Sequence, residues 1–113
     1  GVATDVAGGT SYSMLQTLGE AYKVAILKGR SLTAYDGFYL ATLGNARGLG
    51  MECDIGSLEQ GTYADLVVLD PLATDILAAR DELSETLEDT LFALMLLGDD
   101  RAVHAVYIKG QRQ

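Results

Sequence analysis

The chain has 113 residues, of which 49% are hydrophobic, so it can bury the core of one domain but not of several. Sixteen acidic against eight basic residues give a net charge of -8, which disfavours partners with phosphate backbones or anionic lipid surfaces. The single cysteine, Cys53, excludes an intrachain disulfide and a zinc cluster of thiolates, and it fits a reducing cytoplasm.

No segment of the sequence suits a bilayer. The longest apolar run, residues 91–97, is far shorter than the roughly 20 residues that a membrane-spanning helix needs. The chain opens inside an apolar stretch without a starting Met, which is typical of a processed or truncated chain. We therefore expect a cytoplasmic protein that binds neither nucleic acid nor membrane.

The first predicted element is a short strand that carries the best candidate for a catalytic group. Residues 2–6 are small and partly β-branched, and a glycine-rich stretch follows, so we expect a buried strand that ends near Asp5. Catalytic groups of barrel enzymes sit at this edge of the sheet. The local pattern alone favours a simpler role, in which the Asp5 carboxylate caps a turn by bonding to the backbone of Ala7 or Gly8.

The glycine-rich residues 8–11 offer a weaker site. They would let the backbone approach a ligand closely, just ahead of a helix whose first N–H groups can bind an anion. Such a stretch is more often a flexible connection with a helix cap. A small-anion or nucleotide site at this point is therefore the third of our functional hypotheses.

Two helices are predicted next. Residues 12–28 carry apolar side chains at three-and-four spacing, which is one face of an amphipathic helix. Ser13 with Gln16 predicts a capping box at its start, and Gly29 fits its end. Residues 35–45 continue with helical spacing and predict a second, shorter helix.

The pattern then changes to that of strands. Residues 55–58 predict a strand, residues 59–61 a turn, and residues 64–70 a buried strand. Asp65 and Asp70 flank the second strand, where carboxylates are usually solvated or hold a turn. We assign both a structural role.

The last third predicts a helix and a closing strand. Residues 71–85 are acidic and weakly patterned, whereas residues 87–97 predict a helix with Thr86 or Ser84 as its cap. Residues 103–110 alternate in part and end in a Gly turn, which predicts the closing strand.

The chain lacks the side chains of a complete catalytic site. A catalytic zinc usually takes about three protein ligands plus water, but this sequence has one His, one Cys and scattered carboxylates. His104 lies inside a predicted strand, which disfavours a metal role. A Ser-His-Asp arrangement would have to recruit that same residue, and nothing in the spacing supports it.

Four motifs nevertheless carry a resemblance to a known family. Residues 2–6 (VATDV), with GTS at 9–11 and ML at 14–15, resemble the segment of guanine deaminases that ends the eighth barrel strand and begins the following helix. LATLGNARGLG at 40–50 resembles the helix with which many amidohydrolase-superfamily members leave the barrel. IGSLEQG at 55–61 through ADLVVLD at 64–70 is similar to the returning β-domain, and residues 87–110 resemble the last helix and strand.

The resemblance implies an α/β fold and a metal-dependent reaction. Residues 1–50 would be the end of an amidohydrolase-type TIM barrel, with its last strand and following helices, and residues 51–70 with 102–113 would form part of a small β-sandwich domain. Residues 71–101 would be an acidic connection and the C-terminal helix. A closed (β/α)8 barrel needs about 250 residues, so this chain would be only the C-terminal part.

The implied chemistry is the conversion of guanine and water to xanthine and ammonia by water bound to zinc or iron. Asp5 matches the aspartate that contacts the metal and handles the proton of the attacking water, so it is both the catalytic and the metal residue. No substrate-binding residue is assigned. The histidine ligands and the acid-base glutamate of the family lie upstream of anything in this sequence.

Two functional readings follow for the chain by itself. The first is a segment of a guanine deaminase, acting on guanine or a related aminopurine, which is inactive and binds no metal tightly unless the missing upstream barrel portion is supplied. The alternative is a non-catalytic α+β module derived from an amidohydrolase. This module would cover the apolar surface left by the absent barrel through self-association, which predicts a homo-oligomer.

Overall fold

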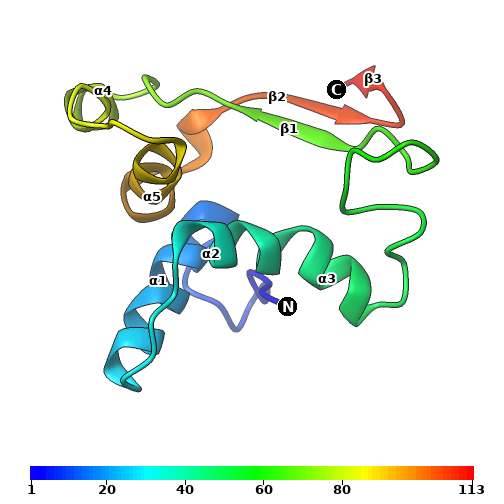
Figure 1. Cartoon of the computed structure of the whole chain (residues 1–113), viewed down its shortest axis with the longest axis horizontal. Helices are drawn as coiled ribbons and strands as arrows, with labels where there is room; N and C mark the ends of the chain where they lie inside the picture. Colours follow the sequence, from blue (N-terminus) through cyan, green and yellow to red (C-terminus); the bar gives the residue numbers. More distant parts are fainter.

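The computed structural model describes all 113 residues. Three N-terminal helices lie on one side of the molecule, a small sheet lies on the other, and the remaining two helices lie at one end (Figure 1). No helix is long and apolar enough to cross a membrane. The elements in chain order are α1 (Met14–Leu27), α2 (Ala34–Ala41), α3 (Leu43–Gly48), β1 (Leu66–Leu69), α4 (Asp75–Asp81), α5 (Leu87–Leu97), a 3-10 turn (Asp100–Ala102), β2 (Val103–Ile108) and β3 (Gln111–Arg112).

Helix α1 confirms the predicted first helix and both of its ends. Ser13 Oγ accepts a hydrogen bond from Gln16 N, as a cap requires, but Gln16 Oε1 accepts from the Ser11 hydroxyl instead of completing a capping box. At the other end Gly29 adopts φ +68°, and Arg30 N donates to Ala25 O at 2.9 Å. This pattern is a Schellman motif, which needs a left-handed residue at that position.

The predicted second helix is present but broken into α2 and α3. Thr33 and Asp36 form a capping box at the start of α2, and the break falls at Thr42, whose φ and ψ are -120° and -103°. The Thr42 hydroxyl donates to Phe38 O at 2.7 Å, so a side chain competes with the helix for its backbone groups. Helical spacing continues through the break, which is why periodicity could not reveal it.

The sheet has three strands in the order β1-β2-β3. Strands β1 and β2 are antiparallel with Val67 opposite Val106, and β2 pairs with β3 through a turn. The strands predicted in 64–70 and 103–110 are therefore present in shortened form. The sheet joins two segments that lie far apart in the sequence.

Two predicted strands are not formed. Residues 55–58 run through turns, because Gly56 takes φ +91°, which an extended strand excludes. Residues 2–6 are also not a strand, and residues 1–4 make no backbone–backbone hydrogen bond. A strand exists only when another strand pairs with it, and nothing in this chain pairs with residues 2–6.

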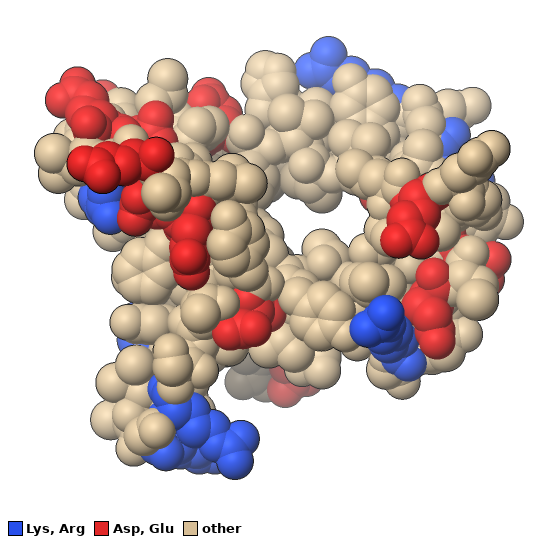
Figure 2. All heavy atoms as spheres, viewed as in Figure 1, with Lys and Arg blue, Asp and Glu red and all other residues tan.

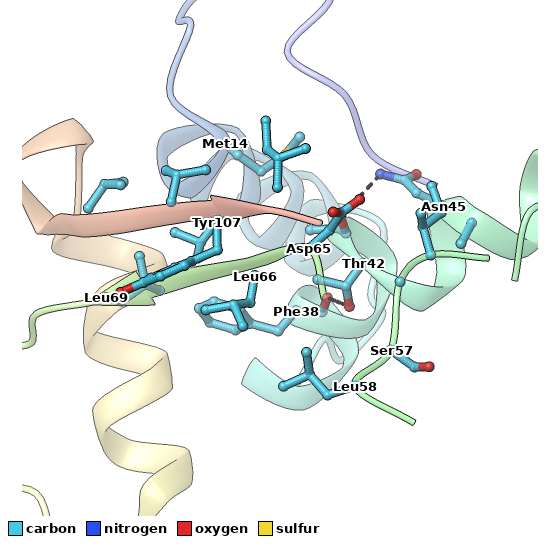
Figure 3. Close-up of a pocket in the computed structure, with 18 of the residues that line it drawn as sticks. Met14, Phe38, Thr42, Asn45, Ser57, Leu58, Asp65, Leu66, Leu69 and Tyr107 are labelled. Atoms are coloured by element: carbon cyan, nitrogen blue, oxygen red, sulfur yellow. Dashed lines mark hydrogen bonds between the residues drawn. The ribbon is translucent and has the colours of Figure 1, made fainter. Parts of the chain in front are cut away.

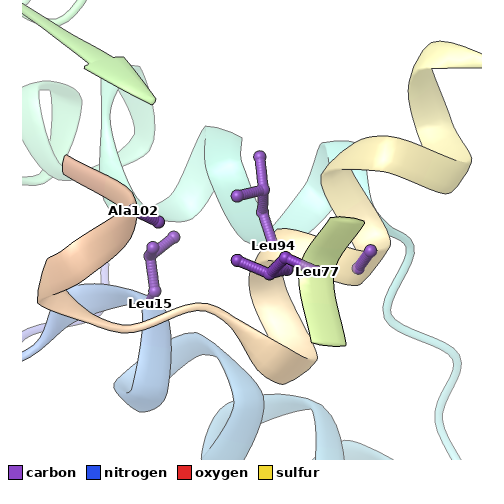
Figure 4. Packing of buried hydrophobic residues seen from close by; sticks show 5 residues of the cluster. Leu15, Leu77, Leu94 and Ala102 are labelled. Carbon is purple, nitrogen blue, oxygen red and sulfur yellow. The ribbon is translucent and has the colours of Figure 1, made fainter. Parts of the chain in front are cut away.

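Helix α4 lies in the stretch that sequence patterning left without structure. Thr74 caps it by accepting from Leu77 N, and Leu77 itself is 1% exposed. Leu77 packs with Leu15, Leu94 and Ala102 in the main core cluster (Figure 4). Packing against α5, rather than a strong local pattern, therefore stabilises this short helix.

The core is small for so apolar a chain. Only 13 of the 113 residues are buried, and many large hydrophobic side chains are exposed. The cluster joins α1, α4, α5 and the 3-10 turn, whereas α3 and the sheet each have only one buried residue, Ala46 and Ala105, outside it. A large apolar surface is left without a partner in this chain.

Helix α5 starts where the sequence predicted, with Thr86 as its cap. The Thr86 hydroxyl accepts from Asp89 N, and the Asp89 carboxylate accepts from Thr86 N, which completes a capping box. Hydrogen bonds from the Thr86 hydroxyl and from the backbone N–H groups of Glu85 and Thr86 hold the pKa of Asp89 below its ordinary value. The associated stability is complete above that ordinary value of 3.8 and is lost as the pH falls through the lower folded value.

Replacing Thr86 by Ala should lower the free energy of unfolding by about 1 kcal/mol, because an orphan N–H of α5 loses its acceptor. Urea unfolding followed by circular dichroism measures the change. Thr10→Ala is the matched control, since Thr10 is exposed and makes no side-chain hydrogen bond. Equal midpoints for the two variants would contradict the capping role.

Candidate functional site

Asp5 lies in an exposed turn between the N-terminal segment and α1. Its carbonyl oxygen accepts hydrogen bonds from the N–H groups of Gly8, at 2.8 Å, and Gly9. Asp5 has φ +49° and Ala7 has φ +81°. Left-handed backbone is uncommon for residues other than Gly, and Asp tolerates it better than Ala. The turn therefore holds Asp5 in a conformation that an ordinary extended strand would not give it.

The Asp5 carboxylate makes no hydrogen bond and no salt bridge in the structure. The turn is closed by the main-chain oxygen of Asp5, so the simpler prediction of a side-chain cap on Ala7 or Gly8 is wrong. Oxygen Oδ2 lies so close to Gly8 that a Cβ there would stand 2.5 Å from it. A glycine at position 8 thus leaves the carboxylate uncovered and available to another group.

The main groove of the molecule is apolar and does not include Asp5. It has a volume of about 740 Å³ and lies between helices α1 to α3 and the β1–β2 pair. Figure 2 shows it as an opening through this view of the molecule, and Figure 3 shows Phe38, Leu66 and Tyr107 on its walls. Of its 22 lining residues, 16 are hydrophobic, and polar members such as Thr42, Asn45 and Asp65 already bond to the backbone of this chain, which disfavours a purine site.

No group of three or more His, Cys, Asp or Glu side chains comes together that could hold a metal ion. Cys53 and His104 are both exposed, the latter on β2. Asp65 accepts from Lys109 N at 2.7 Å, and Asp70 accepts from Leu72 N at 2.8 Å, so both have the structural roles predicted for them. Asp5 is the only residue predicted to be catalytic, and its carboxylate has no hydrogen-bond or salt-bridge partner in this chain.

The hydroxyls of Ser11 and Ser13 beside the glycine-rich stretch already have partners in this chain. Ser11 Oγ donates to Gln16 Oε1 and accepts from Ser13 N, and Ser13 Oγ caps the helix. The hollow beside them is also lined by Glu20 and Lys23, which pair with each other at 2.7 Å, so the lysine charge is already matched by a carboxylate. These contacts weigh against the anion or nucleotide site considered above.

One polar residue near Asp5 had no role in the sequence prediction. Asn45, on α3, accepts a hydrogen bond from Val2 N at 2.9 Å and donates one to Val2 O at 2.7 Å. The partners are 43 positions apart in the sequence, so no local pattern could have paired them. Asn45 therefore ties α3 to the segment that leads into Asp5.

Comparison with known proteins finds the same fold in deaminases. The model of the amidohydrolase family matches residues 1–112. Guanine deaminase of Escherichia coli K12 is 49% identical over 111 residues, which cover 98% of this chain and 25% of that protein. The solved structure of E. coli guanine deaminase superposes with a TM-score of 0.94 at 48% identity, over 97% of this chain and 26% of that one.

A more distant structure is an adenosine deaminase of Xanthomonas campestris with bound zinc. It superposes with a TM-score of 0.68 at 27% identity, over 88% of this chain and 21% of that one. The chain thus spans about a quarter of the length of the E. coli relative it matches. Because the family match runs over nearly the whole sequence and the fold agrees with it, this chain belongs to the amidohydrolase family.

Proposed function

We propose that this chain supplies one catalytic carboxylate, Asp5, to a hydrolase that deaminates guanine or a related aminopurine. The observation that carries the proposal is an unpaired carboxylate, held at a left-handed position, in a chain that matches a guanine deaminase over nearly all of its length. The reaction would convert guanine and water to xanthine and ammonia, in the cytoplasm, as part of purine breakdown.

Asp5 is chemically suited to handle a proton. A carboxylate within hydrogen-bond reach of the attacking water accepts its proton as the water adds to the ring carbon, and can return a proton as ammonia leaves. Because the Asp5 carboxylate has no hydrogen-bond partner in this chain, both of its oxygens are available for this proton transfer. The largely apolar groove does not include Asp5 and would not suit the polar purine, so the substrate site would be completed by residues outside this chain.

The residues present do not make a metal site. Asp5 can offer one oxygen donor, whereas a catalytic zinc usually needs about three protein ligands, and no cluster of donors forms anywhere in the chain. The zinc in the Xanthomonas relative and the family membership support a zinc- or iron-dependent enzyme in which the other ligands lie upstream. We expect the 113 residues alone to bind zinc weakly.

The arrangement of the elements supports a division of the chain between two bodies of a larger enzyme. Residues 1–50 would end a TIM barrel, and residues 51–70 with 102–113 would form part of a β domain, since β1 and β2 pair with each other. Residues 71–101 would connect them through α4 and α5. The exposed walls of the groove would then be covered by the upstream portion.

The alternative is a non-catalytic module that associates with itself, and the small core favours it. Exposed apolar side chains such as Leu49, Leu58 and Leu83, each more than two-thirds exposed, would be covered in a homo-oligomer. Sedimentation of the 113-residue chain over a hundredfold range of concentration separates the readings. A mass that stays at 12.0 kDa throughout would remove the self-association alternative.

The deaminase proposal is tested by a chimera. The matched quarter of E. coli guanine deaminase is replaced by this chain, and the release of ammonia from guanine is measured for the chimera, the parent enzyme and the isolated chain. We expect activity in the chimera and none in the isolated chain. A chimera that unfolds cooperatively and binds zinc like the parent, yet leaves guanine unchanged, would contradict the proposal.

A further inference from the structure

We propose that Asn45 is a positioning residue, which sets the register of residues 1–4 and thereby decides which way the Asp5 carboxylate faces. This inference rests on the proposed role of Asp5. Its basis is the pair of hydrogen bonds between the Asn45 side chain and both backbone groups of Val2.

The two bonds reproduce the contact of a neighbouring strand. In an antiparallel ladder, one residue gives its N–H and its C=O to the same opposite residue. Here the side-chain amide of Asn45 takes the place of that residue, because its Oδ1 accepts from Val2 N and its Nδ2 donates to Val2 O. An amide can do both, whereas a carboxylate or a hydroxyl of the same reach cannot satisfy both groups in this geometry.

These are the only hydrogen bonds that residues 1–4 make. No backbone–backbone bond involves them, and no other side chain bonds to them. Gly1 also lies against the amide so closely that a Cβ at position 1 would overlap Asn45 Oδ1. The segment is therefore fixed by Asn45 at its start and by the Asp5 turn at its end.

Register matters because successive side chains of an extended segment point to opposite faces. A slip of one residue past Asn45 would turn the side chains at positions 2–4 to the other face and would displace the turn that holds Asp5. A carboxylate misplaced by about 1 Å can cost roughly 100-fold in rate. The hydrogen-bonded backbone of Val2 is three positions before Asp5. This short distance along the chain lets Asn45 control the direction of the Asp5 carboxylate.

Asn45 is itself held in place by the helix break. Its Nδ2 also approaches Ala41 O, at 3.4 Å, which is the last residue of α2 before the interruption at Thr42. The break starts α3 at Leu43 and turns Asn45 towards the N-terminal segment, at the end of the groove seen in Figure 3. The helix break at Thr42 thus places the Asn45 side chain where it can bond to Val2.

The first test uses the chimera with Asn45→Ala and the isosteric Asn45→Asp, which keeps the acceptor but loses the donor. We expect kcat for guanine to fall by about 10-fold or more in each, with KM within about twofold, because the loss affects a transferring group more than substrate binding. Arg47→Ala is the control on the same helix, since Arg47 is exposed and bonds only to Tyr39. Unchanged kcat in both Asn45 variants would overturn the proposal.

A double-mutant cycle separates positioning from general loss of structure. In the Asp5→Asn background, Asn45→Ala should change the residual kcat by less than about twofold, because Asn45 acts through a carboxylate that is no longer there. An equal fall in both backgrounds would overturn the inference while leaving the role of Asp5 intact. A fully active Asp5→Asn chimera would instead overturn the proposed function.

A third measurement does not depend on activity. In the nitrogen-15 spectrum of the 113-residue chain, Asn45→Ala should shift the Val2 amide signal and speed its exchange with solvent by about 10-fold, as expected when a hydrogen bond is lost. The Thr4 amide, which has no partner, serves as the internal reference. Identical Val2 exchange in the two proteins would contradict the contact itself.

Discussion

Replacing Asp5 by Asn in the chimera should lower kcat for guanine deamination by about 100-fold or more. The amide that replaces the carboxylate is nearly isosteric, but it cannot take the proton of the attacking water, and general acid-base groups contribute roughly 10²- to 10⁴-fold. Steady-state release of ammonia from guanine measures the change. Because Asp5 is exposed and its side chain makes no hydrogen bond, the variant should keep the stability of its parent.

A matched control and a metal assay sharpen this result. Asp54→Asn changes an exposed carboxylate that also has no side-chain hydrogen bond, and it should leave kcat unchanged. Zinc content, measured on the same Asp5→Asn sample, should fall if Asp5 is also a ligand and stay constant if it only transfers a proton. Full activity in Asp5→Asn would remove this residue from the mechanism.

Replacing Leu77 by Ala should lower the free energy of unfolding of the 113-residue chain by about 2–5 kcal/mol. Leu77 is 1% exposed and packs in the cluster with Leu15 and Leu94, so its removal leaves a cavity at the place where α4 meets α5 and α1. The midpoint of thermal unfolding should fall by about 8 °C or more. Few single substitutions should cost as much, because Leu18, Leu77 and Met95 are the only large side chains that are fully buried.

Leu83→Ala is the control for this experiment. It deletes the same atoms from a leucine that is 73% exposed and follows α4 directly, so it should change the free energy of unfolding by less than about 0.5 kcal/mol. Calorimetry of both variants gives the comparison. Similar losses of stability would mean that the cluster around Leu77 is not the main core.

The local elements with strong signals could be predicted from the sequence. Helices α1 and α5 combine apolar residues at helical spacing with caps at Ser13 and Thr86, and these signals act within one or two turns of the chain. The strands β1 and β2 were also recognisable, although their lengths were overestimated. Helix α4 was missed, because its stability comes from burying Leu77 against another helix.

The candidate site, like the fold, could be predicted only in part from the sequence. The sequence by itself pointed to Asp5 and, through its motifs, to the amidohydrolase family, since both depend on residues that are close together in the chain. Only the tertiary structure showed that residues 2–6 form no strand, that the Asp5 carboxylate is unpaired, and that Asn45 holds Val2. Whether a short extended segment becomes a strand depends on a partner for its backbone, and residues far along the chain decide that.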